Sequence, residues 1–291
     1  MSGPAELAPI TSRPLAQGDG WRVDEVTCRC GPKDRRFEER HDWTSIAAVL
    51  SGVFTYRSDH GRAVMAPGSL LLGEVGGCFE CGHDHGVGDR CVSFHFSPAL
   101  TEEIAGGLAG RGRRSGFGRP NLPPVEALLP LMASARALAA DPEALRVEQL
   151  ALNVAAAALG LDQDAVETLP SAADERRAAM AVRIIEARLA EPLTIAGLAA
   201  EVGLARRRFA TAFKAAVGVT PYNFILGRRL DAAAERLRSD DETILGIALD
   251  VGLGDLSEFT RRFGARYGVS PGVYRRRRGA DPWLGEPWRP L

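Results

Sequence analysis

The region from Thr194 to Tyr274 contains one pattern twice, and this duplication constrains the fold more than any other feature of the sequence. The two copies are TIAGLAAEVGLARRRFATAFKAAVGVTPYNF and TILGIALDVGLGDLSEFTRRFGARYGVSPGVY, which begin at Thr194 and Thr243, 49 residues apart. After the shared glycine the second copy gains one residue, so the later matches stand 50 residues apart. Self-similarity at this period predicts one supersecondary unit that is used twice.

The first half of each copy predicts a short helix followed by a tight turn. Thr194 stands at a helix N-cap position, where its hydroxyl can accept a hydrogen bond from an otherwise unpaired backbone N–H group. Leu198 and Val202 are four residues apart, which places them on one face of that helix. Gly203 follows, and glycine readily adopts the positive φ that a tight turn between helices needs.

The second half of each copy predicts a longer helix with one apolar and one basic face. In the first copy this helix begins near Arg206 and buries Phe209, Phe213 and Val217, which recur every four residues. The opposite face is the one that would enter a DNA major groove; it carries Arg207, Ala210, Thr211 and Lys214. For one motif, an ordinary helical hairpin with a solvated basic face is the alternative. The repeated turn glycine and the repeated Ser/Thr-Pro at the end of each copy favour two helix-turn-helix units.

The region from Asp174 to Arg278 resembles the DNA-binding domain of the AraC/XylS family of bacterial transcription regulators. The most specific part is IALDVGLGDLSEFTRRFGARYGVSPGVYRR in the second copy, which is similar to the family signature almost throughout. The resemblance implies an all-α domain of seven helices, in which a central helix joins two helix-turn-helix units. Here the central helix would run from Pro221 to Arg238, with Thr220 as its cap and proline in its first turn.

The resemblance also implies which side chains meet DNA. The base-reading positions are Arg207, Ala210, Thr211, Leu256, Ser257, Glu258 and Arg261. The phosphate positions are Thr194, Arg206, Arg208, Lys214, Thr243 and Arg262. Arg207 and Arg261 are the best suited to guanine, because an arginine fork can bond the guanine edge twice. Glu258 is unusual beside phosphates, and it would either accept a hydrogen bond from cytosine or point away from the DNA.

The charge of the chain is divided between its two halves. Residues 171–278 contain 19 Lys and Arg against 13 Asp and Glu, whereas the rest contains 17 against 24, although the whole chain has a formal net charge of only −1. A basic C-terminal part joined to an acidic N-terminal part is typical of a DNA-binding domain fused to a domain of another kind.

The sequence predicts the α+β class, with a β-rich N-terminal domain ahead of the helical one. Short alternating segments with Gly and Pro corners favour an antiparallel barrel or jelly roll, and H-x-x-x-x-I-x-x-V-L-x-G-x-F…P-G-S-L-L-L from His41 to Leu72 resembles, more loosely, the cupin-like effector domain of the same family. The helices that follow would pack on the barrel or form a homodimer contact, and both remain open. The predicted parts are a flexible arm (1–20), a cupin-like effector or sensor domain (21–100), a helical segment (101–165), a linker (166–174), the DNA-binding domain (175–278) and a C-terminal tail (279–291).

A cluster of cysteine and histidine follows the Pro-Gly corner of this domain. The candidate metal or redox residues are Cys78, Cys81, His83, His85 and Cys91. Thiolate and imidazole at this spacing suit a zinc site. A thiol redox sensor and a polar turn with small buried cysteines are the alternatives. Cys28 and Cys30 share one strand face, and they either approach this cluster across the barrel or belong to the core.

These observations favour a sequence-specific regulator that binds double-stranded DNA and senses a small molecule or a metal through its N-terminal domain. RNA polymerase is an expected partner if the protein activates transcription. A cupin-like metal-dependent enzyme with an accessory DNA-binding domain is the alternative, and a DNA-repair methyl acceptor is a third hypothesis that the cysteine spacing disfavours. With no apolar run long enough for a membrane span and no secretory signal, we expect a cytoplasmic protein. Five cysteines, an odd number, argue against a disulfide framework.

Overall fold

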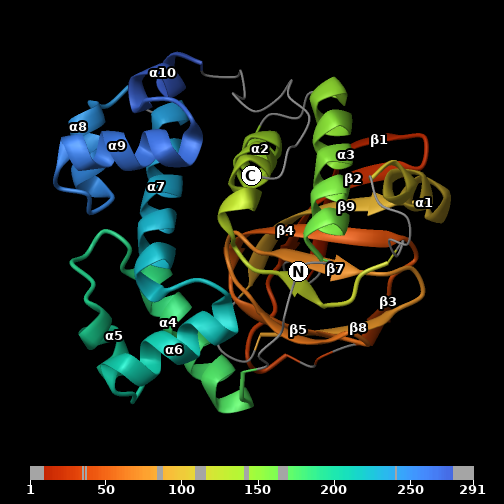
Figure 1. Ribbon diagram of the computed structural model, residues 1–291, viewed down its shortest axis with the longest axis horizontal. Coiled ribbons are helices and arrows are strands. Elements are labelled where there is room, and N and C mark those ends of the chain that lie inside the picture. Colours follow the sequence, from red (N-terminus) through yellow and green to blue (C-terminus); the bar gives the residue numbers. More distant parts are fainter. Residues whose placement is uncertain are drawn as a thin grey trace, which may run out of the picture.

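The computed structural model describes residues 10–34, 36, 38–83, 88–108, 116–140, 144–162, 170–239 and 241–277 (Figure 1). Within these ranges a β-rich N-terminal half is followed by a helical C-terminal half. This mixed architecture is the one that the sequence predicted. Among the described helices, none combines the length and the apolar character that a membrane crossing requires.

The described strands of the N-terminal half form two antiparallel sheets. The six-stranded sheet has the order β1-β2-β9-β4-β7-β10, and the four-stranded sheet has the order β3-β8-β5-β6. The strands are β1 (Ile10–Gly18), β2 (Trp21–Cys28), β3 (Glu38–Arg40), β4 (Thr44–Gly52), β5 (Phe54–Ser58), β6 (Gly61–Met65), β7 (Leu70–Gly73), β8 (Cys78–Gly82), β9 (Asp89–Phe96) and β10 (Asn121–Leu122).

Strand β1 corrects the prediction of a flexible arm for residues 10–18. This segment pairs with β2 from Ile10, opposite Cys28, to Gly18, opposite Trp21. Pro14 lies at a register shift on this edge strand, where a missing backbone donor is tolerated. The backbone pairing orders the segment even though its composition resembles that of a loop.

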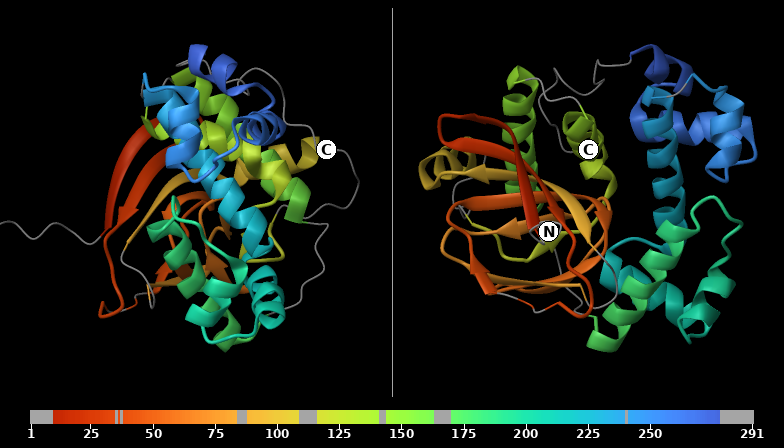
Figure 2. Two further views of the ribbon diagram at one scale, coloured as in Figure 1. Left: turned by 90° about the vertical axis from the view of Figure 1, so that its left-hand side faces the viewer. Right: turned by 180° about the vertical axis from the view of Figure 1, so that it is seen from behind.

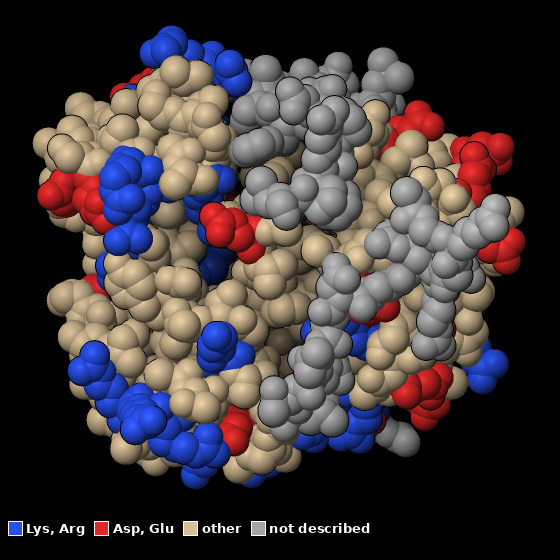
Figure 3. Space-filling model, in the orientation of Figure 1, with Lys and Arg blue, Asp and Glu red and all other residues tan. Residues whose placement is uncertain are grey.

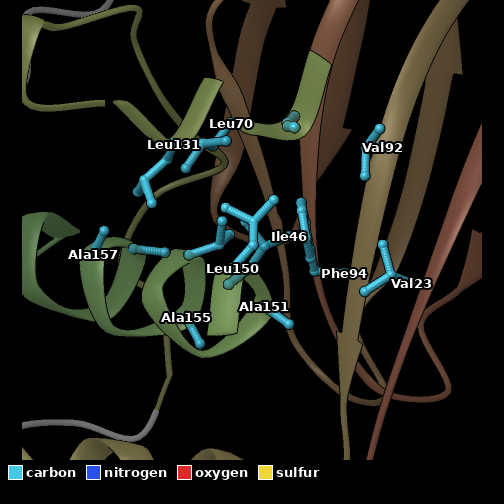
Figure 4. Packing of buried hydrophobic residues seen from close by; sticks show 14 of the residues in the cluster. Val23, Ile46, Leu70, Val92, Phe94, Leu131, Leu150, Ala151, Ala155 and Ala157 are labelled. Carbon is cyan, nitrogen blue, oxygen red and sulfur yellow. The ribbon is translucent and has the colours of Figure 1, made fainter. Parts of the chain in front are cut away.

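Helices α1 (Pro98–Gly107), α2 (Leu129–Ala140) and α3 (Ala144–Leu161) pack with the six-stranded sheet around the largest core cluster of the molecule. Figure 4 shows Leu150 and Ala151 of α3 turned toward Ile46 and Phe94 of the sheet. Alanines along α3 let its backbone approach the strands closely, and each large apolar side chain buried there contributes about 1.5–3 kcal/mol. The apolar stripes of these helices therefore pack on the chain's own sheet.

The C-terminal half contains two helix-turn-helix units on either side of a long helix. Its helices are α4 (Ala172–Ala187), α5 (Ile195–Glu201), α6 (Arg206–Val217), α7 (Pro221–Ser239), α8 (Ile244–Asp250), α9 (Leu256–Tyr267) and α10 (Pro271–Arg276). Figures 1 and 2 show α7 as a column with α5 and α6 at one end and α8 and α9 at the other. The Thr220 hydroxyl accepts a hydrogen bond from Asn223 N at 3.3 Å, so the predicted cap of this central helix is confirmed.

Local signals in the two copies produce the same local structure. The Thr194 hydroxyl accepts from Gly197 N and the Thr243 hydroxyl accepts from Gly246 N, both at 3.0 Å. The turn glycine has a φ of 69° in the first copy (Gly203) and 80° in the second. Phenylalanines at equivalent positions are buried in both units: Phe209 and Phe213 in one, Phe259 and Phe263 in the other. The predicted caps, turns and apolar faces are confirmed.

Contacts between the two halves involve both ends of α7. Val53, Val64 and Ala66 of the β-rich half belong to the same core cluster as α4, α5 and α6, and Arg62 forms an ion pair with Glu175. Farther along α7, Arg136 of α2 donates from Nη1 to Glu235 Oε1 at 3.0 Å. Both helix-turn-helix units are therefore held against the N-terminal half.

Candidate nucleic-acid interface and effector cavity

The second helix of the first unit, α6, presents a basic face. Arg206, Arg207, Thr211 and Lys214 are exposed, and Ala210 is half-buried. Within the described part of the chain, Arg207 makes no ion pair, so its guanidinium is available to an outside acceptor. The Thr211 hydroxyl donates to the Arg207 carbonyl at 3.2 Å, which leaves the hydroxyl oxygen free to accept a hydrogen bond.

Arg208 differs from the arginines beside it. It donates from Nη2 to both carboxylate oxygens of Asp174, at 2.9 and 2.7 Å, and so ties α6 to the first turn of α4. Hydrogen bonds from Arg208 hold the pKa of Asp174 below its ordinary value, despite an opposing effect of burial. A phosphate contact by Arg208 would therefore compete with this pair.

The equivalent helix of the second unit, α9, has arginines restrained by an acidic neighbour. Glu258 accepts hydrogen bonds from Arg261, at 2.8 and 2.9 Å, and from Arg262. These bonds, that of Arg261 first, lower the pKa of Glu258 to about 2. Arg262 also lies over the Tyr222 ring, 5.7 Å from its centroid. Leu256, 40% exposed, and Ser257 complete the exposed start of the helix.

Figure 3 shows these features on one face of the molecule. Lys and Arg gather over α5 and α6, and again over α9, where acidic side chains lie among them. A groove of about 290 Å³ lies between α7, α9 and the N-terminal half, and Arg261 and Arg262 are among its lining residues. One side of α9 therefore faces the N-terminal half.

A second cavity, of about 230 Å³, lies between the two β-sheets. Its lining includes sulfur and imidazole groups together with charged and hydroxyl side chains. The former are Cys28, Cys30, Cys81, Cys91, His41, His83 and His95, and the latter are Asp34, Arg36, Glu39, Asp89, Ser45 and Ser93. Desolvation lowers the pKa of His41 and of His95 to about 4, so both rings are neutral at physiological pH. His41 is within 3.0 Å of the Tyr56 hydroxyl, and His95 Nδ1 is within 3.0 Å of the Ser45 hydroxyl.

Comparison with known proteins finds a family match for the β-rich N-terminal part and another for the helical C-terminal part. A model of the AraC-like ligand binding domain matches residues 25–155, and a helix-turn-helix domain model matches residues 198–277. The chain is 39% identical over 80 residues to the HTH-type transcriptional regulator CdhR of Pseudomonas aeruginosa. The matched stretch covers 28% of this chain and 24% of CdhR. It is 39% identical over 92 residues to the transposon Tn10 TetD protein of Escherichia coli. This match covers 32% of this chain and 67% of TetD. The chain belongs to the AraC/XylS family of transcription regulators.

A crystal structure of an AraC-type transcriptional regulator from Chromobacterium violaceum is also similar, with 27% identity and a TM-score of 0.35, over 38% of this chain and 98% of that one. The match to CdhR spans only about a quarter of that relative. The effector and the partners of this family member are therefore inferred from its own residues.

Within the ligand-binding part of this AraC/XylS-family protein, the predicted Cys/His set is only partly brought together. Cys81, His83 and Cys91 line the cavity. Cys78 does not, because Cys78 and Cys81 are three residues apart on β8 and alternate residues of a strand face opposite sides. The Cys78 sulfur instead accepts from Arg40 at 3.6 Å. His85 lies outside the described residues.

Two residues outside the predicted set complete the cluster. Cys28 and Asp89 are directly paired in the register of β2 and β9, and with His83 they form a group whose potential ligand atoms all lie within 4.8 Å of one another. The C-R-C spacing placed Cys28 and Cys30 on one strand face, which was the available signal for the first of them. Asp89 had a sequence signal too, because it follows His83 and His85 in an H-x-H-x3-D pattern that resembles the H-x-H-x3-4-E pattern of metal-binding cupins, with Asp in place of Glu.

The environment of the thiols bears on their chemistry. Burial raises the pKa of Cys28 to about 12, and burial followed by the charge of Asp89 raises the pKa of Cys81 and Cys91 well above the ordinary value. All five cysteines are free. Because a reactive thiol needs a stabilised thiolate, these sites do not favour the redox-sensor hypothesis.

Proposed function

We propose that this protein binds specific DNA sequences through α6 and α9 and regulates transcription in response to an effector bound between its β-sheets. The duplicated unit carries this proposal, since it presents two equivalent helices at opposite ends of α7 with their phenylalanine faces inward. With 19 residues, α7 spans about 28 Å at about 1.5 Å per residue. That length is close to the ~34 Å that separates successive major-groove segments on one face of DNA.

The proposed contacts divide between bases and phosphates. Arg207 and Thr211 of α6 are exposed and would read bases, and Arg261 of α9 would do so after leaving Glu258. Ala210, Leu256 and Ser257 would supply apolar and hydroxyl contacts beside them. Phosphates would be bound by Arg206, Arg208, Lys214 and Arg262 and by the helix N-termini capped by Thr194 and Thr243.

The proposed effector site is the cavity between the sheets. Its volume of about 230 Å³ suits a small molecule or a metal ion. The two antiparallel sheets on either side of it support a cupin-like, jelly-roll description of residues 21–100. We retain as proposals the helical segment 101–165, the linker 166–174, the seven-helix DNA-binding domain 175–278 and the tail 279–291. Residues 172–174 of the predicted linker already belong to α4, so the linker would end at its N-cap, Ser171. Within these ranges, 109–115, 141–143, 163–169, 240 and 278–291 lie outside the described residues.

We also propose two interactions with proteins, a homodimer and a contact with RNA polymerase. A homodimer would place two DNA-binding domains on adjacent sites, although the apolar stripes of α2 and α3 are already used in the core of this chain. RNA polymerase would be a partner if the protein activates transcription. The alternative of a cupin-like enzyme is not favoured, because the chain's family is one of transcription regulators.

Selection of binding sites from random DNA by the purified full-length chain tests this function. We expect enrichment of one sequence, with an affinity that falls steeply as salt rises because phosphate contacts release counterions. Arg207→Ala should weaken binding to the selected site more than to random DNA, whereas Lys214→Ala should weaken both equally. Failure to enrich any sequence, together with a salt-independent affinity, would refute a DNA-reading function.

A further inference from the structure

Three strands bring a soft donor, an imidazole and a carboxylate to one end of the cavity between the sheets. Cys28 ends β2, His83 directly follows β8, and Asp89 begins β9. The β2–β9 register places Cys28 opposite Asp89, so the sheet itself fixes this pair on one face. The ligand atoms of the three residues all lie within 4.8 Å of one another, and the three residues line the same cavity.

The group is buried and strongly connected. The side chains of His83 and Asp89 are 5% and 7% exposed. Asp89 Oδ2 is 2.6 Å from His83 Nε2, and Asp89 Oδ1 accepts from Cys91 Sγ at 3.3 Å. A buried carboxylate requires such compensation, and within the sheets only polar neighbours or a cation can supply it.

The charge and the donor atoms of these three side chains favour one class of bound ion. A divalent cation bound by the Cys28 thiolate, the Asp89 carboxylate and a neutral His83 imidazole would leave no net charge in the buried site. Sulfur and nitrogen donors suit zinc and its neighbours in the first transition series, whereas magnesium and calcium prefer oxygen donors throughout. Three protein ligands would also leave one position of a tetrahedral ion for an outside ligand.

We propose that Cys28, His83 and Asp89 bind a divalent transition-metal ion of the zinc type, and that this ion forms part of the effector site. The proposal rests on the effector role assigned to the cavity. On binding, the Cys28 thiol gives its proton to solvent. The ion replaces the hydrogen bond between His83 Nε2 and Asp89, and the neutral His83 ring that binds through Nε2 carries its proton on Nδ1. The two atoms now 2.6 Å apart would then separate to about 3.3 Å, the spacing of two tetrahedral ligands at about 2.0 Å from zinc.

Cobalt titration of the full-length chain tests the proposal. Protein stripped with a chelator is titrated with Co²⁺, thiolate–cobalt charge-transfer absorption is recorded, and Zn²⁺ is added as a competitor. We expect one ion per chain, a band showing a sulfur ligand, and displacement by Zn²⁺. Cys28→Ser should abolish the band, and His83→Ala should weaken affinity by more than the about 10–100-fold that loss of an outer-sphere partner costs.

Cys78→Ser is the matched control, because Cys78 lies on β8, the strand that leads to His83, but does not line the cavity. It should bind cobalt as the unchanged protein does. The unchanged protein alone decides the case if a variant fails to fold, since absence of a charge-transfer band or of saturable binding overturns the proposal. Retention of the band by a folded Cys28→Ser variant overturns it too. The DNA selection is repeated on metal-free protein, so that loss of metal binding with retained DNA binding refutes the metal site and not the regulator.

Discussion

Asp231 is a buried carboxylate that is contacted by several basic and hydroxyl side chains of the C-terminal half. Its replacement gives the largest stability change that we predict. Asp231 is 6% exposed on α7 and accepts hydrogen bonds from Arg266 Nε at 2.9 Å, Tyr267 Oη at 2.8 Å and Arg228 Nη1 at 3.2 Å. Arg136 Nη2 of α2 lies 3.6 Å away. Burial opposes ionisation, but the charges of these arginines hold the pKa of Asp231 far below its ordinary value of 3.8.

Asp231→Asn keeps the shape and removes the charge, so the arginines lose their common counter-ion. Loss of one partner of a buried pair typically costs about 3–5 kcal/mol, against about 5–15 kcal/mol of total stability. We expect the free energy of unfolding to fall by that amount, measured by urea denaturation followed by circular dichroism. Asp250→Asn is the control, because Asp250 pairs with Arg236 at 2.9 Å but is 55% exposed, and it should cost at most about 1 kcal/mol.

A double-mutant cycle shows how much of this loss belongs to the contact between the two halves. Arg136→Met alone and combined with Asp231→Asn should give a coupling of about 0.5–3 kcal/mol. A loss for Asp231→Asn equal to that of the Asp250 control would refute the reasoning from burial. Zero coupling in the cycle would show instead that Arg136 and Asp231 do not interact in solution.

Four further outcomes can be measured, one on Asp231 and three on other residues. Unfolding of Asp231→Asn should be less sensitive to acid than unfolding of the unchanged protein. Folding lowers the pKa of Asp231, so this carboxylate contributes stability that is complete above about pH 4 and lost as pH falls. Denaturation measured at a series of pH values would show the difference. Gly203→Ala should cost about 1–2 kcal/mol in urea denaturation, since its φ of 69° is unfavourable for alanine. Glu258→Gln should raise affinity for DNA of any sequence about twofold to fivefold in anisotropy titrations, because it releases two arginines and removes a negative charge. Arg261→Ala should weaken the selected site roughly 5- to 150-fold and relax one base position on repeated selection, whereas equal loss on random DNA would mean a phosphate contact.

The C-terminal half was predictable because its signals are local. Thr194, Gly203 and the phenylalanines every four residues act within one or two helical turns of themselves, so spacing alone determined cap, turn and buried face. The pairing of Glu258 with both Arg261 and Arg262 was missed, although the available signal was equally local: the two arginines stand three and four residues after the glutamate on one helix.

The cavity was less predictable because strand pairing assembles it over long separations. Cys28 and Asp89 are far apart in the chain, and only the β2–β9 register makes them neighbours. Cys78 and Cys81 were grouped wrongly for the opposite reason, because they are close in the sequence but not in the structure. The spacing C-x2-C brings two sulfurs together in a turn, whereas in a strand it places them on opposite faces. Strand β1 was taken for a loose arm for the related reason that its order comes from its partner strand and not from its composition.

Asp231 also connects the two questions that the molecule raises, how it reads DNA and how an effector is sensed. Through Arg266 and Tyr267 it holds α9, and through Arg136 it contacts α2, which packs on the sheet that forms one wall of the cavity. A ligand changes such an arrangement only by binding one of its states better than another. If effector binding moves α2 relative to the sheet, the contact most directly altered at α7 is that of Arg136, and the orientation of α9 depends on the same carboxylate. The Arg136–Asp231 double-mutant cycle, measured with and without Zn²⁺, therefore tests whether the cavity and α9 are coupled. If they are, the interaction free energy between Arg136 and Asp231 changes when the ion binds.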